Sequence, residues 1–105
     1  MSLILEVYFR KQIAMNWTFL TNHGHVLIIL SRNPDIRISE LSEQIGISQR
    51  QVSNILRDLH DSGYLTKQKE GRRNSYKISA DAPLRHKSNQ DHTVNELIGI
   101  LGDKE

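Results

Sequence analysis

The side chains best suited to recognising another molecule gather on one predicted helix of this 105-residue chain. Between Ser48 and Ser62 its polar positions carry mainly Gln, Arg, Ser and Asn. Arg, Gln and Asn form paired hydrogen bonds with the edges of guanine and adenine in the DNA major groove. The candidate base-contacting residues are Ser48, Gln49, Arg50, Gln51, Ser53, Asn54 and Arg57. The alternative interpretation is a helical hairpin that merely has a polar face.

A second polar group follows, between two runs in which apolar and polar residues alternate. Residues 64–69 and 75–79 have the period of two that is typical of strands, and residues 70–74 read as a polar turn. Adjacent arginines at a hairpin tip can pair with phosphates. The candidate backbone-contacting residues are Lys67, Lys69, Arg72, Arg73, Asn74 and Tyr76. A hairpin tip that only improves solubility is the alternative.

Charge is distributed unevenly along the chain. From Ser48 to Lys87 there are nine cationic and four anionic side chains, a net charge of +5, whereas the whole chain carries +2. A local basic excess of this kind is the electrostatic footprint of a phosphate-binding surface. A solvated face is the simpler alternative, so the charge matters only together with the motifs around it.

Other kinds of chemistry find little support in the sequence. Without cysteine there is no thiolate nucleophile, no disulfide and no cysteine-based metal site. Gly-x-Ser-x-Gly, His-Glu-x-x-His and phosphate-binding glycine loops are absent. The five histidines are scattered, without the spacing of a metal site. We therefore expect no enzymatic activity, no metal and no cofactor.

The elements that must position the polar groups begin with a helix over residues 21–32. Asn33-Pro34 stops it, because proline disfavours the helical conformation in the residue before it. Residues 35–38 form a short extended link, and Ser39 is the predicted N-cap of a helix over residues 40–45.

The next helix begins after a tight turn at Gly46 and carries a clear start signal. Ser48 and Gln51 have the spacing of a capping box. An apolar stripe of Val52, Ile55, Leu56 and Leu59 follows, and Ser62-Gly63 ends the helix. Helix, three-residue turn, helix and basic hairpin is the order of a helix-turn-helix unit followed by a two-stranded hairpin.

The two ends of the chain are apolar and are candidates for self-association. Residues 3–14 fit a strand or a helix, with a slight preference for helix. A last helix is predicted over residues 91–102, with Thr93 and Glu96 as a second capping box. Its candidate dimer contacts are Val94, Leu97, Ile98 and Leu101. No segment has the length or composition of a membrane span or a secretory signal, so a cytoplasmic location is expected.

Residues 38–65, with the Gly71-Arg72-Arg73-Asn74-Ser75-Tyr76 segment, resemble MarR/ArsR-type winged-helix transcriptional regulators of the small single-domain bacterial type. The resemblance covers about residues 16–101 and does not reach residues 1–14. It departs at Ser42, where the pattern usually has alanine. It implies a recognition helix over residues 48–62 in the major groove, a wing over residues 69–76 on the backbone or minor groove, and a homodimer.

The predicted fold is therefore α+β, mainly α: a winged helix-turn-helix with a three-helix core, a β-hairpin wing and a C-terminal helix. Residues 1–15 are an N-terminal extension and candidate dimer contact, residues 16–82 the DNA-binding domain, and residues 83–105 a C-terminal segment for dimerisation. The predicted function is sequence-specific binding of double-stranded DNA as a transcriptional regulator, with repression the commoner mode that the resemblance implies. The alternative is a winged helix that binds proteins and does not bind DNA specifically.

Overall fold

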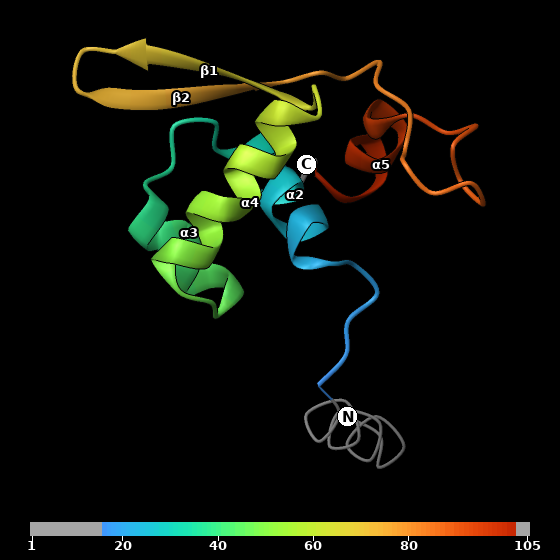
Figure 1. The fold of residues 1–105 in the computed structure, drawn as a ribbon, viewed down its shortest axis with the longest axis horizontal. Coiled ribbons are helices and arrows are strands. Elements are labelled where there is room, and N and C mark those ends of the chain that lie inside the picture. The colour runs from blue at the N-terminus through green and yellow to red at the C-terminus, as the bar shows by residue number, and fades with distance from the viewer. Residues whose placement is uncertain (1–15, 103–105) are drawn as a thin grey trace, which may run out of the picture.

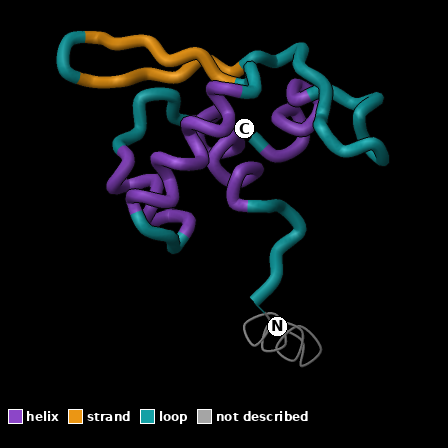
Figure 2. Tube along the Cα trace, in the orientation of Figure 1, coloured by secondary structure: helices purple, strands orange, loops and turns teal. Residues whose placement is uncertain are grey.

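A computed structural model describes residues 16–102 of the chain. Three helices come first, then a hairpin, then a last helix (Figures 1 and 2). Their bounds are α2 Asn22–Arg32, α3 Ile38–Ile45, α4 Gln49–Asp61, β1 Leu65–Glu70, β2 Arg73–Ile78 and α5 Val94–Leu101. The predicted fold class is confirmed. The predicted helix over residues 3–14 and the N-terminal dimer contact lie outside the described residues.

Helix α2 is the central element of the core. Thr21 caps its start, with the Thr21 hydroxyl accepting a hydrogen bond from the Gly24 backbone at 3.2 Å. Along its length Val26 and Leu30 are almost fully buried. The helix packs against α3, α4, β2 and α5, so burial of this one apolar helix organises the whole domain.

The start of α3 differs from the prediction. Ser39 is not the N-cap: the helix begins at Ile38, and Arg37 occupies the cap position. The Arg37 guanidinium cannot accept a hydrogen bond, so it does not cap the helix with its side chain. The Arg37 backbone N–H donates to the Glu40 carboxylate at 3.3 Å. The earlier start places the half-buried side chain of Ile38 against the core, and this burial outweighs the local preference of serine for an N-cap.

Helix α4 begins as the sequence predicts. The Gln51 backbone donates to the Ser48 hydroxyl at 3.1 Å, and the Ser48 backbone donates to the Gln51 side chain at 3.0 Å. Before it, Gly46 adopts a left-handed conformation with φ 85°, which allows the chain to leave α3 in a tight turn. The predicted stripe of Val52, Ile55, Leu56 and Leu59 is buried.

The hairpin has a tighter turn than the sequence suggested. Its ladder runs from Leu65–Ile78 to Glu70–Arg73, so only Gly71 and Arg72 form the turn rather than residues 70–74. Gly71 has φ 65° and Arg72 does not have a positive φ, the pattern of a type II′ turn. Opposite charges facing each other at Glu70 and Arg73 favour this last pair of the ladder.

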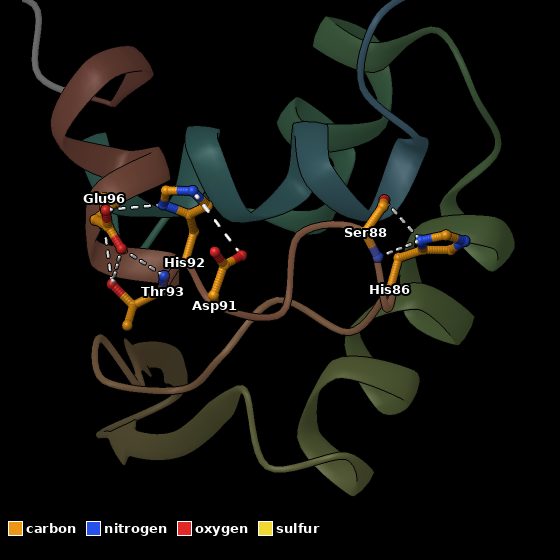
Figure 3. Close-up of polar contacts among 6 residues, drawn as sticks. All are labelled: His86, Ser88, Asp91, His92, Thr93 and Glu96. Atoms are coloured by element: carbon orange, nitrogen blue, oxygen red, sulfur yellow. Dashed lines mark hydrogen bonds and ion pairs between the residues drawn. The ribbon is translucent and has the colours of Figure 1, made fainter.

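The segment between the hairpin and α5 closes on itself. Pro83 and Thr93 form an antiparallel bridge, flanked by hydrogen bonds from Leu84 to His92 and from Val94 to Ala82, both 2.9 Å. The predicted capping box is present, with the Thr93 backbone donating to Glu96 at 2.8 Å and the Glu96 backbone donating to the Thr93 hydroxyl at 3.3 Å (Figure 3). The helix therefore starts at Val94, later than the predicted residue 91.

Helix α5 folds back onto α2. The Arg32 guanidinium donates to the carbonyl oxygens of Leu101 at 2.7 Å and Gly102 at 3.0 Å, where it neutralises the negative end of the helix. Val94 is fully buried in the core of its own chain, so it is not available as a dimer contact. Its burial shows that α5 belongs to the domain core.

Candidate nucleic-acid interface

The exposed side of α4 carries the predicted base-contacting residues. Gln49, Arg50, Asn54 and Arg57 are exposed, and Ser53 is half-buried. Ser48 and Gln51 are exposed but hold each other in the capping box, so their side chains are partly used by the start of the helix. The buried stripe on the opposite side holds the helix against α2 and α3, and this leaves the polar side facing outward.

A polar contact between α2 and α4 helps to orient α4. The His23 ring Nε2, at the start of α2, lies 2.9 Å from the Asp58 carboxylate of α4. Asp58 lies four positions from Asn54 on the same helix, so this contact acts close to the polar side. Its two side chains are largely exposed, so it orients the helix more than it stabilises the fold.

The hairpin presents two different faces. Lys67 pairs with Tyr76 and Lys69 pairs with Asn74, so these four predicted wing residues share one face. Arg72 is exposed at the turn, as predicted. Arg73 is not at the tip: it lies in β2, on the other face, and its guanidinium donates to the Asp35 carbonyl oxygen at 2.9 Å.

A cleft of about 350 Å³ joins α4 to the hairpin. Its lining brings two predicted residues of α4 together with three predicted wing residues, and it adds His60, which the sequence did not indicate. The lining residues are Ile38, Ser53, Leu56, Arg57, His60, Lys67, Asn74 and Tyr76. Partial burial raises the pKa of the Tyr76 phenol, so that group stays a neutral hydroxyl at ordinary pH.

A second hollow, of about 370 Å³, lies between the α2–α3 link and the hairpin. Three arginines line it: Arg37, Arg72 and Arg73. Arg37 was missed because it lies outside the basic segment from Ser48 to Lys87. Only the packing of the link along β2 brings it there, where the Tyr76 backbone donates to the Pro34 carbonyl oxygen at 3.0 Å.

The sequence that forms this arrangement matches a known protein family over part of its length. Residues 20–66 match the model of the winged helix-turn-helix DNA-binding family. The matched residues include α2, α3 and α4, the three helices of the winged helix-turn-helix fold. The match runs from just before α2 to the second residue of β1, so β2 and α5 lie outside the matched residues.

Among solved structures, the winged helix-turn-helix chain is similar to AdcR, a zinc-dependent MarR family transcriptional regulator, in its Zn(II)-bound state. The sequences are 18% identical, the TM-score is 0.49, and the likeness covers 75% of this chain and 67% of that one. No curated protein matches the sequence. At this identity no functional residue transfers from the solved structure.

Two features of the described part of the winged helix-turn-helix chain concern other kinds of site. Within residues 16–102, no group of three or more His, Asp or Glu side chains is arranged to hold a metal ion. His92 does contact carboxylates, at 3.0 Å from Glu96 and 4.0 Å from Asp91, but all three lie at an exposed helix start (Figure 3). None of the helices in this range is long and apolar enough to cross a membrane.

Proposed function

We propose that this protein binds specific double-stranded DNA sequences and regulates transcription, with repression as its mode of action. Helix α4 enters the major groove, and the hairpin contacts the backbone or the adjacent minor groove. The single observation that carries this proposal is the exposed polar side of α4, next to a basic hairpin. None of the candidate contact residues on either element is acidic.

The chemistry of α4 supports sequence reading rather than charge attraction alone. Gln49, Arg50 and Asn54 are exposed on a helix of 13 residues, and a B-DNA major groove is wide enough to admit an α-helix. Side chains at the start of such a helix are the ones that usually reach base edges. Arg50 lies in this first turn and is the leading candidate for contact with guanine.

The proposal includes a homodimer. Four large apolar side chains are exposed in the described chain: Phe19 (93%), Ile100 (79%), Trp17 (55%) and Leu101 (39%). Leu97 and Ile98 are half-buried on the same last helix. Apolar patches left exposed are often interaction sites. A two-fold dimer covers them and spaces its two recognition helices by about one DNA turn, roughly 34 Å, on a near-palindromic site.

The experiment that tests DNA recognition is selection of duplexes from a random library, followed by affinity measurements at several salt concentrations. The expected result is one enriched, near-palindromic sequence, bound about a thousandfold or more tightly than random duplex. The affinity for both falls steeply with salt. If no sequence is enriched and duplex binding is negligible at low salt, the protein-binding alternative replaces this function.

Sedimentation tests the dimer. Because Val94 is part of the core, deletion of α5 is unsuitable, and the Ile100→Ser/Leu101→Ser variant is used instead. The full chain is expected to sediment as a dimer at micromolar concentration. The variant is expected to be a folded monomer, as judged by circular dichroism. A monomeric wild type, or a variant that stays dimeric, contradicts the assignment of α5 to the interface.

A further inference from the structure

The cleft between α4 and the hairpin has a lining suited to an anion. Arg57 from α4 and Lys67 from β1 supply positive charge, and His60, Asn74 and Tyr76 supply further hydrogen-bonding groups. None of its lining residues has a carboxylate. Ile38 and Leu56 form its apolar part, which lowers the local dielectric and strengthens charge interactions near it.

Two groups in the cleft, His60 and Tyr76, have free hydrogen-bonding capacity. The His60 ring Nδ1 lies 3.3 Å from the Asp61 carboxylate, and Nε2 has no protein partner within the described chain. The Tyr76 hydroxyl likewise contacts no protein acceptor in that range, and its raised pKa keeps the proton on it. The Tyr76 hydroxyl can donate one hydrogen bond to a ligand in the cleft. His60 can donate one from Nε2 in the tautomer that carries the proton there, which gives up the exposed Nδ1 contact with Asp61.

The position of the cleft indicates which anion reaches it. Ser53 and Arg57 line the cleft and also belong to the polar side of α4. A DNA strand that follows α4 toward the hairpin therefore passes the mouth of the cleft. Phosphodiester oxygens accept hydrogen bonds from Arg, Lys and neutral side chains in such interfaces.

We propose that this cleft holds one backbone phosphate of the bound duplex. Arg57 and Lys67 supply the charge, and His60 and Tyr76 donate hydrogen bonds to the phosphate oxygens. The site deepens the function proposed above and rests on it. It adds His60 to the interface and makes the joint between recognition helix and wing a contact point of its own, separate from base reading by α4.

A scan of the selected duplex with single neutral methylphosphonate linkages locates this phosphate. Each duplex is tested against wild type and against His60→Ala, at about pH 8, where histidine side chains are neutral. In wild type, one linkage per half-site is expected to weaken binding about tenfold or more. In His60→Ala, native duplex binds about threefold to tenfold more weakly, and the methylphosphonate penalty shrinks at that linkage alone.

Three further variants define the chemistry. His60→Gln keeps an N–H donor and is expected to recover most of the lost affinity. Arg57→Ala lowers the slope of log affinity against log salt concentration by about one unit. His60→Ala leaves this slope unchanged because a neutral group releases no counterion. His86→Ala is the matched control. It removes a histidine from the exposed loop shown in Figure 3, where the His86 ring accepts a hydrogen bond from the Ser88 backbone at 3.0 Å. This variant is expected to leave the affinity for duplex and the methylphosphonate profile unchanged.

Two results overturn this site. One is a His60→Ala variant with unchanged affinity and an unchanged methylphosphonate profile. The other is a flat profile in wild type combined with binding of inorganic phosphate to the cleft in the absence of DNA, which identifies a site for a free anion. Both results leave duplex binding by wild type intact, so they are distinct from failure of the proposed function.

Discussion

Arg72 and Arg73 are neighbours in the sequence, but the structure gives them different roles. Arg72 is exposed in the two-residue turn, and no described residue restrains its guanidinium. Arg73 is in β2 and donates to the Asp35 carbonyl oxygen at 2.9 Å. We expect Arg72→Ala to remove a phosphate contact and Arg73→Ala to remove a tether that positions the hairpin.

The sizes of the two effects follow from these contacts. Loss of one phosphate contact lowers the slope of log affinity against log salt by about 0.9. Between about 50 and 200 mM salt, this makes the affinity ratio of wild type to Arg72→Ala shrink about threefold. Loss of the Arg73 hydrogen bond is expected to destabilise the fold by about 0.5–1.5 kcal/mol. Arg72→Ala should leave stability within about 0.5 kcal/mol of wild type.

Fluorescence anisotropy with a labelled duplex measures the slopes, and urea unfolding measures the stabilities. Lys77→Ala is the control for charge, since Lys77 lies on the same hairpin face as Arg73 and makes no hydrogen bond to the link within the described chain. The double variant should lower the slope by about one unit. A decrease of two units means that both arginines contact phosphate. An unchanged slope removes the wing from the interface, and either result refutes the division of roles.

Three further predictions concern other contacts. Arg50→Ala is expected to cost about 1–3 kcal/mol of binding on the selected duplex and much less on random duplex; equal losses would show that Arg50 contacts only phosphate. Arg32→Ala loses hydrogen bonds to Leu101 and Gly102 and should lower the free energy of unfolding by about 1–3 kcal/mol in urea, whereas Arg85→Ala, in the exposed loop, should not. The hydrogen bond with Glu96 and the charges of Glu96 and Asp91 raise the pKa of His92 above its ordinary 6.5, and the same bond lowers the pKa of Glu96 below its ordinary 4.5. The stability that His92 contributes is thus complete below pH 6.5 and is lost as the pH rises through its raised pKa. The stability that Glu96 contributes is complete above pH 4.5 and is lost as the pH falls through its lowered pKa. The urea midpoint should therefore decline on both sides of this pH window, and His92→Gln should abolish the decline at alkaline pH.

The parts of the fold that local sequence determines were predicted well. The capping boxes at Ser48 and Thr93, the glycine exit at Gly46 and the buried stripe of α4 each depend on residues within one or two helical turns of each other. Such signals can be recognised without knowledge of the tertiary structure. The order of elements followed from them, and with it the winged helix-turn-helix architecture.

The features that were missed depend on contacts between distant segments. The start of α3 is set by burial of Ile38, which no local preference encodes. The role of Arg73 depends on a carbonyl oxygen 38 residues away, and His60 gains significance only when the hairpin packs beside α4. Val94 was assigned to a surface because an isolated apolar stripe does not reveal which partner will cover it.

The attachment of the hairpin to the α2–α3 link relies on main-chain acceptors. The Tyr76 backbone donates to the Pro34 carbonyl oxygen, and Arg73 donates to that of Asp35. Every residue type supplies such a carbonyl, so substitutions in the link at position 35 preserve the anchorage as long as its backbone path is kept. The tip of the hairpin can therefore be exchanged as a unit: residues 68–72 can be replaced while Arg73 and Tyr76 keep the new loop in place.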